Sequence, residues 1–128
     1  MDAITQQWLE RADYDLKTAR SLLNSRRYLY AAFLCQQCLE KYPKAHISSQ
    51  GKTPPFIHNL TRLAEEAGLS GEMTGLFRKL LGKINPFYIK ARYGEYKSSL
   101  SKICGRKEAA AFFSQTEAFI KWLKPRFR

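Results

Sequence analysis

The chain has 128 residues, of which 45% are hydrophobic and 26% charged, and this balance excludes a disordered or fibrous protein. Its formal net charge is +11, and the excess lies in residues 76–128, which hold 13 Lys and Arg against 3 Asp and Glu. A basic field on one part of a protein attracts polyanions such as RNA, DNA or nucleotides, or an acidic protein partner, although a high charge can also serve solubility alone.

Apolar residues recur at intervals of three and four in the first half of the chain, which is the period of an amphipathic helix. The first such stripe predicts a helix over residues 3–24. The second predicts a helix from about residue 27, which we expect Pro43 to kink or end, because proline lacks the amide proton that the helix needs.

The middle of the chain predicts two further helices. Asn59 as N-cap and Gly68 as C-terminal stop delimit a short third helix. A fourth helix is expected to open at Ser70 and to break near Pro86.

The last third of the chain combines a loop with the clearest helical stripe. Residues 88–105 are polar, aromatic and basic, so we expect them to be largely loop, whereas residues 106–124 predict a helix that ends before Pro125. No segment alternates with the period of a strand. We therefore expect an all-α fold, an antiparallel up-and-down four-helix bundle with an extra short helix, as one domain over residues 1–128.

Targeting signals are not evident in this sequence. No apolar run is long enough to span a bilayer, and the N-terminus has no basic region followed by an apolar core. The three cysteines are odd in number and sit among apolar residues, which is typical of reduced thiols. We therefore expect a cytoplasmic protein that makes no contact with a membrane.

A polar strip on the second predicted helix is the first candidate binding site. Gln37, Glu40, Lys41 and Lys44 follow one another at helical spacing, so they share one face. An amide, a carboxylate and two ammonium groups could bind a phosphate and the edge of a base. The same spacing also fits a solvated face on which Glu40 and Lys44 form an ordinary i,i+4 ion pair.

The segment over residues 88–97 is the second candidate site. Tyrosines and cations interleave in it, and the binding candidates are Tyr88, Lys90, Arg92, Tyr93 and Lys97. Aromatic rings stack on bases while Arg and Lys neutralise phosphates, a combination typical of sites for single-stranded nucleic acid. The alternative is a tyrosine-anchored loop that caps one end of the bundle.

Other motifs predict no catalytic residue, no metal ligand and no cofactor. Cys35-x-x-Cys38 fits the apolar stripe of the second helix and lacks a second pair of ligands at matching spacing. His46 and His58 form no nucleophilic triad that the sequence identifies, and no glycine-rich phosphate loop is present.

Four short motifs in register nevertheless resemble a known family. In chain order they are Trp8-Leu9-x-x-Ala12-x-x-Asp15-Leu16-x-x-Ala19, Tyr28-x-x-Ala31-x-Phe33-x-x-Gln36-Gln37-x-x-Glu40-Lys41-x-x-Lys44-Ala45, His58-Asn59-Leu60-x-x-Leu63 and Ala91-Arg92-Tyr93. Together they resemble a small prokaryotic HEPN domain, and the match covers most of the chain, from about residue 4 to 124.

The HEPN resemblance implies an all-α bundle that pairs into a homodimer and binds a nucleotide or RNA in a cleft between protomers. It also implies a minimal nucleotidyltransferase as protein partner, in a two-component or toxin–antitoxin system. The matching positions that it marks as binding residues are Gln37, Glu40, Lys41, Lys44, His58, Arg92 and Tyr93.

The chain departs from the ribonuclease members of that family, which carry Arg, four to six residues, and then His. Lys41-x4-His46 and Lys52-x5-His58 are the nearest approximations, and lysine lacks the planar fork that arginine offers a phosphate. We therefore expect a non-enzymatic nucleotide- or RNA-binding module. The alternatives are a ribonuclease toxin with a non-standard active site, and a dimeric scaffold whose basic surface docks an acidic partner.

Overall fold

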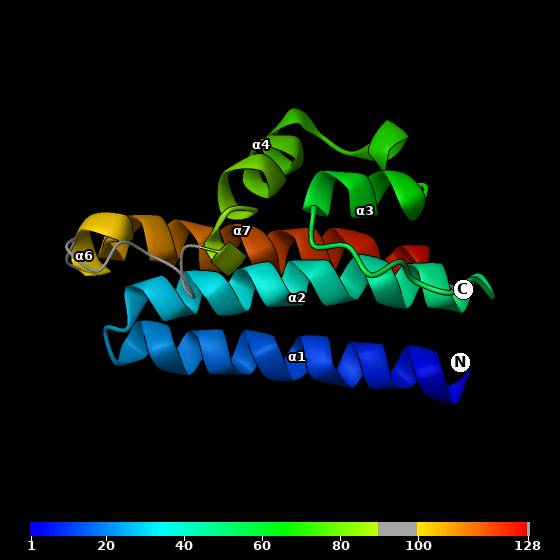
Figure 1. Cartoon of the computed structure of the whole chain (residues 1–128), viewed down its shortest axis with the longest axis horizontal. Helices are drawn as coiled ribbons and strands as arrows, with labels where there is room; N and C mark the ends of the chain where they lie inside the picture. Colours follow the sequence, from blue (N-terminus) through cyan, green and yellow to red (C-terminus); the bar gives the residue numbers. More distant parts are fainter. Residues whose placement is uncertain (90–99, 128) are drawn as a thin grey trace.

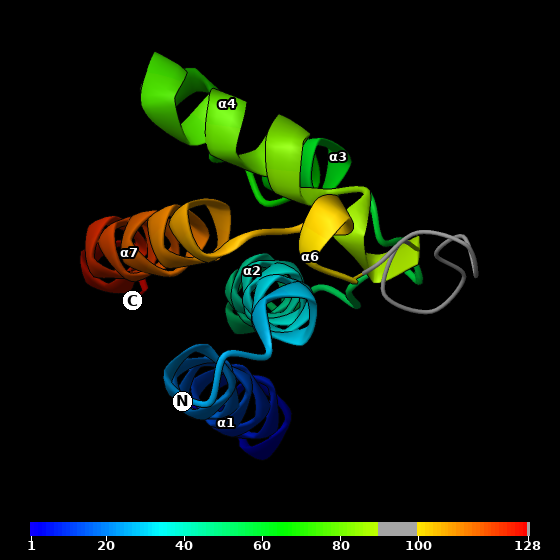
Figure 2. The ribbon, with the colours of Figure 1, turned by 90° about the vertical axis from the view of Figure 1, so that its left-hand side faces the viewer.

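The computed structural model describes residues 1–89 and 100–127, and all regular structure in these ranges is helical (Figure 1). Three long helices lie lengthwise beside one another, α1 (Ala3–Asn24), α2 (Tyr28–Ser49) and α7 (Arg106–Leu123). The shorter α3 (Leu60–Glu66) and α4 (Gly75–Ile84) lie on the side of α2 that faces away from α1 (Figure 2). The expected all-α helical-bundle class is confirmed.

Local capping sets several of the helix ends. The side chain of Asp2 accepts a hydrogen bond from the Thr5 amide at 2.8 Å, and that of Asn59 accepts one from the Arg62 amide at 3.1 Å. Each bond satisfies one of the amides that a helix start leaves free. Gly68 has a φ of 75°, a left-handed conformation that favours glycine, and it lies just past α3. The predicted bounds of α1 and α3 are therefore confirmed.

The second helix does not end at Pro43, as one form of the expectation had it, because α2 continues past this residue to Ser49. A proline inside a helix costs about 3 kcal/mol or more, since a hydrogen bond is lost and the ring meets the preceding turn. In α2 this cost is offset by burial: Tyr42, Lys44 and Ala45 around it are all shielded from solvent.

Two other boundaries differ from the sequence prediction. Ser70 opens a short 3-10 helix (Ser70–Glu72) instead of α4, and Thr74 caps α4 by accepting from the Phe77 amide at 3.3 Å. Within the region expected to be loop, α6 (Leu100–Ile103) forms a single helical turn.

The core is centred on α2, which has α1, α7 and the α3–α4 pair around it (Figure 2). Fully buried side chains come from several of these elements, among them Leu39 and Tyr42 of α2, Phe119 and Leu123 of α7, and Ile84 of α4. In the described part of the chain, no helix combines the length and the apolar character that crossing a membrane requires.

The connection between α2 and α3 brings His58 beside α2. After Ser49 the chain turns and runs back along α2 before α3 begins (Figure 1). His58, two residues before α3, is thereby brought against Glu40 in the middle of α2.

Candidate functional site

Glu40 and Lys44 of the polar strip of α2 are buried and form the i,i+4 ion pair away from solvent, whereas Gln37 and Lys41 are half-buried. Glu40 and Lys44 are 6% and 5% exposed, and the Lys44 ammonium donates to Oε2 of Glu40 at 3.2 Å. The same ammonium lies 5.6 Å from the centre of the Trp8 ring of α1. Buried charges are costly unless they are paired, so this pair holds two charges that water no longer solvates.

His58 binds the other oxygen of the same carboxylate. Its Nδ1 lies 2.9 Å from Oε1 of Glu40, while its side chain is 47% exposed. Because an ionised carboxylate only accepts, Nδ1 carries the proton, and in the neutral ring Nε2 is left as an acceptor. Glu40 thus fixes both the orientation and the tautomer of a histidine that reaches solvent.

Tyr88 lies against this histidine. The two rings stack with their centres 4.6 Å apart and their planes 30° apart. Both residues line a cavity of about 500 Å³, together with Ile57, Asn59, Asn85, Pro86 and Ile89. Two elements far apart in sequence, the start of α3 and the segment after α4, therefore meet at one mixed aromatic and polar pocket.

Gln37 and Lys41 are connected to the α2 strip in different ways. Gln37 donates to the Gln36 side-chain oxygen at 2.7 Å, and Gln36 in turn donates to Oε1 of Glu40 at 3.4 Å. Lys41 instead forms an ion pair with Asp15 of α1, which joins the two helices. Of the residues predicted on α2, Glu40 binds His58 directly, and Lys44 pairs with Glu40. Gln37 reaches Glu40 through Gln36, and Lys41 belongs to the contact between α1 and α2.

The remaining predicted binding residues, Lys90, Arg92, Tyr93 and Lys97, lie outside the described residues. Sequence analysis did not select Gln36, Trp8 or Asn85 as site residues. Gln36 is adjacent to a predicted residue, but helical periodicity alone assigned it to no binding face. Asn85 had no sequence signal beyond its place before Pro86.

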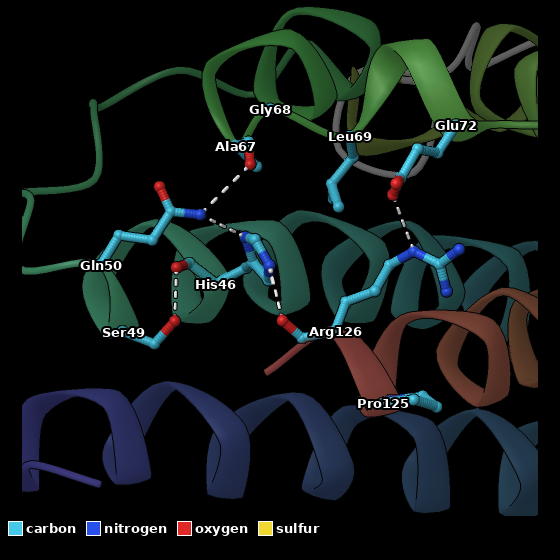
Figure 3. A pocket seen from close by; sticks show the side chains of 9 residues that line it. All are labelled: His46, Ser49, Gln50, Ala67, Gly68, Leu69, Glu72, Pro125 and Arg126. Atoms are coloured by element: carbon cyan, nitrogen blue, oxygen red, sulfur yellow. Dashed lines mark hydrogen bonds and ion pairs between the residues drawn. The ribbon is translucent and has the colours of Figure 1, made fainter. Parts of the chain in front are cut away.

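A second cavity, of about 620 Å³, surrounds His46 at the end of α2 (Figure 3). Nδ1 of His46 accepts from the Gln50 amide at 2.9 Å, and Nε2 donates to the Arg126 carbonyl at 3.3 Å. Arg126 also donates through Nε to Glu72 at 3.0 Å. Burial lowers the pKa of His46, so the ring is neutral and its two nitrogens tie the C-terminal turn to α2.

The cysteines are part of the core. Cys35, Cys38 and Cys104 are buried, and burial raises the pKa of Cys35 to about 12, so its thiol keeps its proton. Among the residues that the structure describes, no group of three or more His, Cys, Asp or Glu side chains is arranged to hold a metal ion.

The protein is an all-α bundle whose central helix carries a buried carboxylate against a solvent-reaching histidine. The HEPN domain family model matches residues 5–126, and the chain belongs to this family. Its fold is similar to that of TT1696 from Thermus thermophilus, with a TM-score of 0.83 and 20% identity over 94% of this chain and 96% of that one. It is also similar to ST0689, an archaeal HEPN homologue, with a TM-score of 0.75 and 22% identity over 97% and 98% of the two chains. No curated protein matches the chain.

Proposed function

We propose that this HEPN protein is a single-domain module that binds a nucleotide or single-stranded RNA and acts as a homodimer beside a minimal nucleotidyltransferase. The observation that carries the proposal is the stacked pair of His58 and Tyr88, which lines a cavity while the buried Glu40 holds the imidazole in place. Such a pair offers a base both an aromatic face and a hydrogen-bonding nitrogen.

The position of Tyr88 favours binding over a purely structural scaffold. A scaffold would use this ring to fill the core, whereas Tyr88 keeps part of its surface exposed and lines a pocket. The rings of bases stack on such surfaces without regard to charge, so phosphate recognition must come from other residues.

The basic C-terminal part of the chain supplies the charges that phosphates need. Lys90, Arg92 and Lys97 follow Tyr88 closely in sequence, and we propose that they neutralise phosphates while Tyr93 contributes a second stacking ring. RNA binding should then weaken steeply as salt rises, because the release of counterions drives the association.

Arg92→Ala tests this assignment, with Arg11→Ala as the matched control. Arg11 is exposed on α1, in the part of the chain without excess charge. We expect Arg92→Ala to weaken binding of a labelled single-stranded RNA by about 1–3 kcal/mol and to reduce the salt dependence, because a charge-assisted phosphate contact is lost. Arg11→Ala should change both much less. Equal affinity of the Arg92→Ala and parent proteins across salt would place the phosphate site elsewhere.

Exposed apolar side chains support the proposed homodimer. Ile4 belongs to the apolar stripe of α1 but is 62% exposed, and Phe56 in the α2–α3 connection is fully exposed. Tyr14, Leu76 and Ile89 are further large side chains left open to solvent. Exposed apolar residues of this kind are suited to an interface between copies. Light scattering at micromolar concentration should give the mass of a dimer, and a monomer mass would contradict this part of the proposal.

A ribonuclease is the second candidate, because a carboxylate-held histidine whose Nε2 has no partner among the described residues can accept a proton from a ribose 2′-hydroxyl. This activity would cleave labelled RNA in the absence of metal and would be lost in His58→Gln. Binding without cleavage by the parent protein would leave the binding module as the function.

A further inference from the structure

Two asparagine side chains in the His58 cavity have their orientation fixed by the backbone of α3. Oδ1 of Asn59 accepts from the Arg62 amide at 3.1 Å, and Oδ1 of Asn85 accepts from the Leu60 amide at 2.9 Å. An amide that accepts from a backbone N–H must use its oxygen, so neither side chain can be flipped. Each therefore turns its nitrogen, with two protons to donate, away from the helix. Neither nitrogen has a hydrogen-bond partner in the described part of the chain.

The third polar group of the cavity has the opposite character. Nδ1 of His58 donates to Glu40, which leaves Nε2 of the neutral ring with a lone pair and no hydrogen-bond partner among the described residues. The residues that line the cavity thus carry two amide donors and one imidazole acceptor. Its remaining lining, Ile57, Pro86, Tyr88 and Ile89, is apolar or aromatic and fits the faces of a planar ring.

A planar ligand that satisfies the two donors and one acceptor of the cavity must itself present two acceptors and one donor. The pyrimidine bases have this inventory: uracil presents two carbonyl oxygens and an N–H, and cytosine presents a carbonyl oxygen, a ring nitrogen and an amino group. The pairing edge of guanine has one acceptor and two donors, and that of adenine has one of each. A purine that presents its pairing edge would therefore leave at least one amide donor of the cavity unpaired, at a cost in affinity.

We propose that this cavity is a base-recognition subsite that selects a pyrimidine of a single-stranded RNA, with Asn59 and Asn85 as donors and His58 Nε2 as acceptor. The inference rests on the proposed RNA binding and adds a base preference to it. Tyr88, stacked on His58, positions the imidazole and borders the space that the base occupies.

The side chains that donate can be changed without removing their caps. In Asn59→Asp and Asn85→Asp an oxygen still accepts from the Arg62 or Leu60 amide, while the donating nitrogen is replaced by an acceptor of the same size. Asn24→Asp, at the exposed end of α1, adds the same charge away from this cavity and is the matched control. Thermal melting of all three variants verifies that each is folded.

The measurement is the dissociation constant of the 12-nucleotide RNAs (rU)12, (rC)12 and (rA)12 at one salt concentration. We expect the parent protein and Asn24→Asp to bind a pyrimidine oligomer roughly tenfold more tightly than (rA)12, the ratio that one unsatisfied polar group produces. Asn59→Asp and Asn85→Asp should each reduce this ratio to about twofold or less, because the added acceptor repels a base carbonyl.

Two results would overturn the pyrimidine subsite alone, and a third would overturn it together with the proposed function. Equal affinity of the parent protein for all three oligomers would leave the proposed RNA binding intact but remove the base preference. A pyrimidine preference that survives both Asn59→Asp and Asn85→Asp would show that it arises elsewhere, for example from the stronger self-stacking of (rA)12. Failure of the parent protein to bind any oligomer would overturn the proposed function together with this inference.

Discussion

The two histidines of the chain differ in what their ring nitrogens contact. Nδ1 and Nε2 of His46 both bind neutral groups, the Gln50 amide and the Arg126 carbonyl, and the residue is 8% exposed. His58 binds the Glu40 carboxylate through Nδ1, and its side chain is 47% exposed. Each has an aromatic neighbour: Phe127 meets His46 edge-on with the ring centres 5.3 Å apart, whereas Tyr88 stacks on His58 with the ring centres 4.6 Å apart.

This difference separates a histidine that holds the fold from one that can meet a ligand. The neutral partners of His46 use both of its nitrogens, and burial lowers its pKa, so it serves as an uncharged link between α2 and the C-terminal turn. The partner of His58 uses one nitrogen and aims the other away from Glu40. The second cavity is the larger of the two, yet its histidine has no hydrogen-bonding capacity left to offer.

The largest loss of folding stability is expected when the carboxylate of Glu40, which binds both Lys44 and His58, is removed. Glu40→Ala removes the partner of a buried ammonium, and uncompensated buried charges cost about 3–5 kcal/mol of folding stability. Urea unfolding should show this loss. Glu117→Ala is the control, because the Arg20–Glu117 pair is exposed and such pairs contribute about 1 kcal/mol or less. Similar losses in the two variants would mean that Lys44 is solvated in the folded protein.

The aromatic neighbours of the two histidines should differ in their effect on binding. Tyr88→Ala should weaken RNA binding by about 1–3 kcal/mol if the ring stacks on a base, whereas Tyr88→Phe should be nearly silent because stacking needs the ring and not the hydroxyl. Phe127→Ala removes the ring beside His46 and should leave affinity unchanged. Fluorescence anisotropy with a labelled RNA measures all three. Equal losses in Tyr88→Ala and Phe127→Ala would contradict the assignment of the site to His58.

Sequence periodicity predicted the fold well because most helices have a local signal for both face and end. The start of α1 follows from Asp2 and the two ends of α3 follow from Asn59 and Gly68, each of which acts on its immediate neighbours. The continuation of α2 through Pro43 was not predictable in this way, because it depends on burial by helices that are distant in sequence.

The sequence predicted several residues of the candidate site, but it did not predict that Glu40 and Lys44 are buried. Glu40, Lys44, His58 and Tyr88 were all candidates, and the structure brings them into one cluster. The helical spacing of Glu40 and Lys44 also fitted a solvated face, because periodicity cannot show that other elements cover α2 on several sides. The donor role of Asn85 depends on the hydrogen bond that its side-chain oxygen accepts from the Leu60 amide. This bond joins two elements that are distant in sequence, so no local pattern specifies it.

The buried His46 should make the folding stability of the protein depend on pH. Because burial lowers its folded pKa, the unfolded chain takes up a proton more readily near and below the ordinary pKa of about 6.5. Stability is therefore fully present above that pH and decreases as the pH falls. His46→Gln should cost about 1–3 kcal/mol at pH 7.5 by removing two hydrogen bonds, and it should lose less further stability than the parent between pH 7.5 and 5.5. A slope as steep as that of the parent, in urea midpoints, would assign the effect to another group.

The smallest effect is expected from Gln50→Glu, which makes the surroundings of His46 resemble those of His58. The introduced carboxylate would accept from a protonated Nδ1 where the amide now donates to it, so the pKa of His46 should rise above its value in the parent protein. At pH 7.5 the stability should change by about 1 kcal/mol or less, because residue 50 is exposed and exposed pairs contribute little. Since the folded protein would then take up the proton more easily, acidification to pH 5.5 should cost less stability than in the parent. Gln50→Ala, which removes the amide and adds no charge, is the control. An NMR titration of the His46 ring in both variants measures the pKa directly. A pKa in Gln50→Glu that is no higher than in Gln50→Ala would show that the partner of Nδ1 does not set the difference between the two histidines.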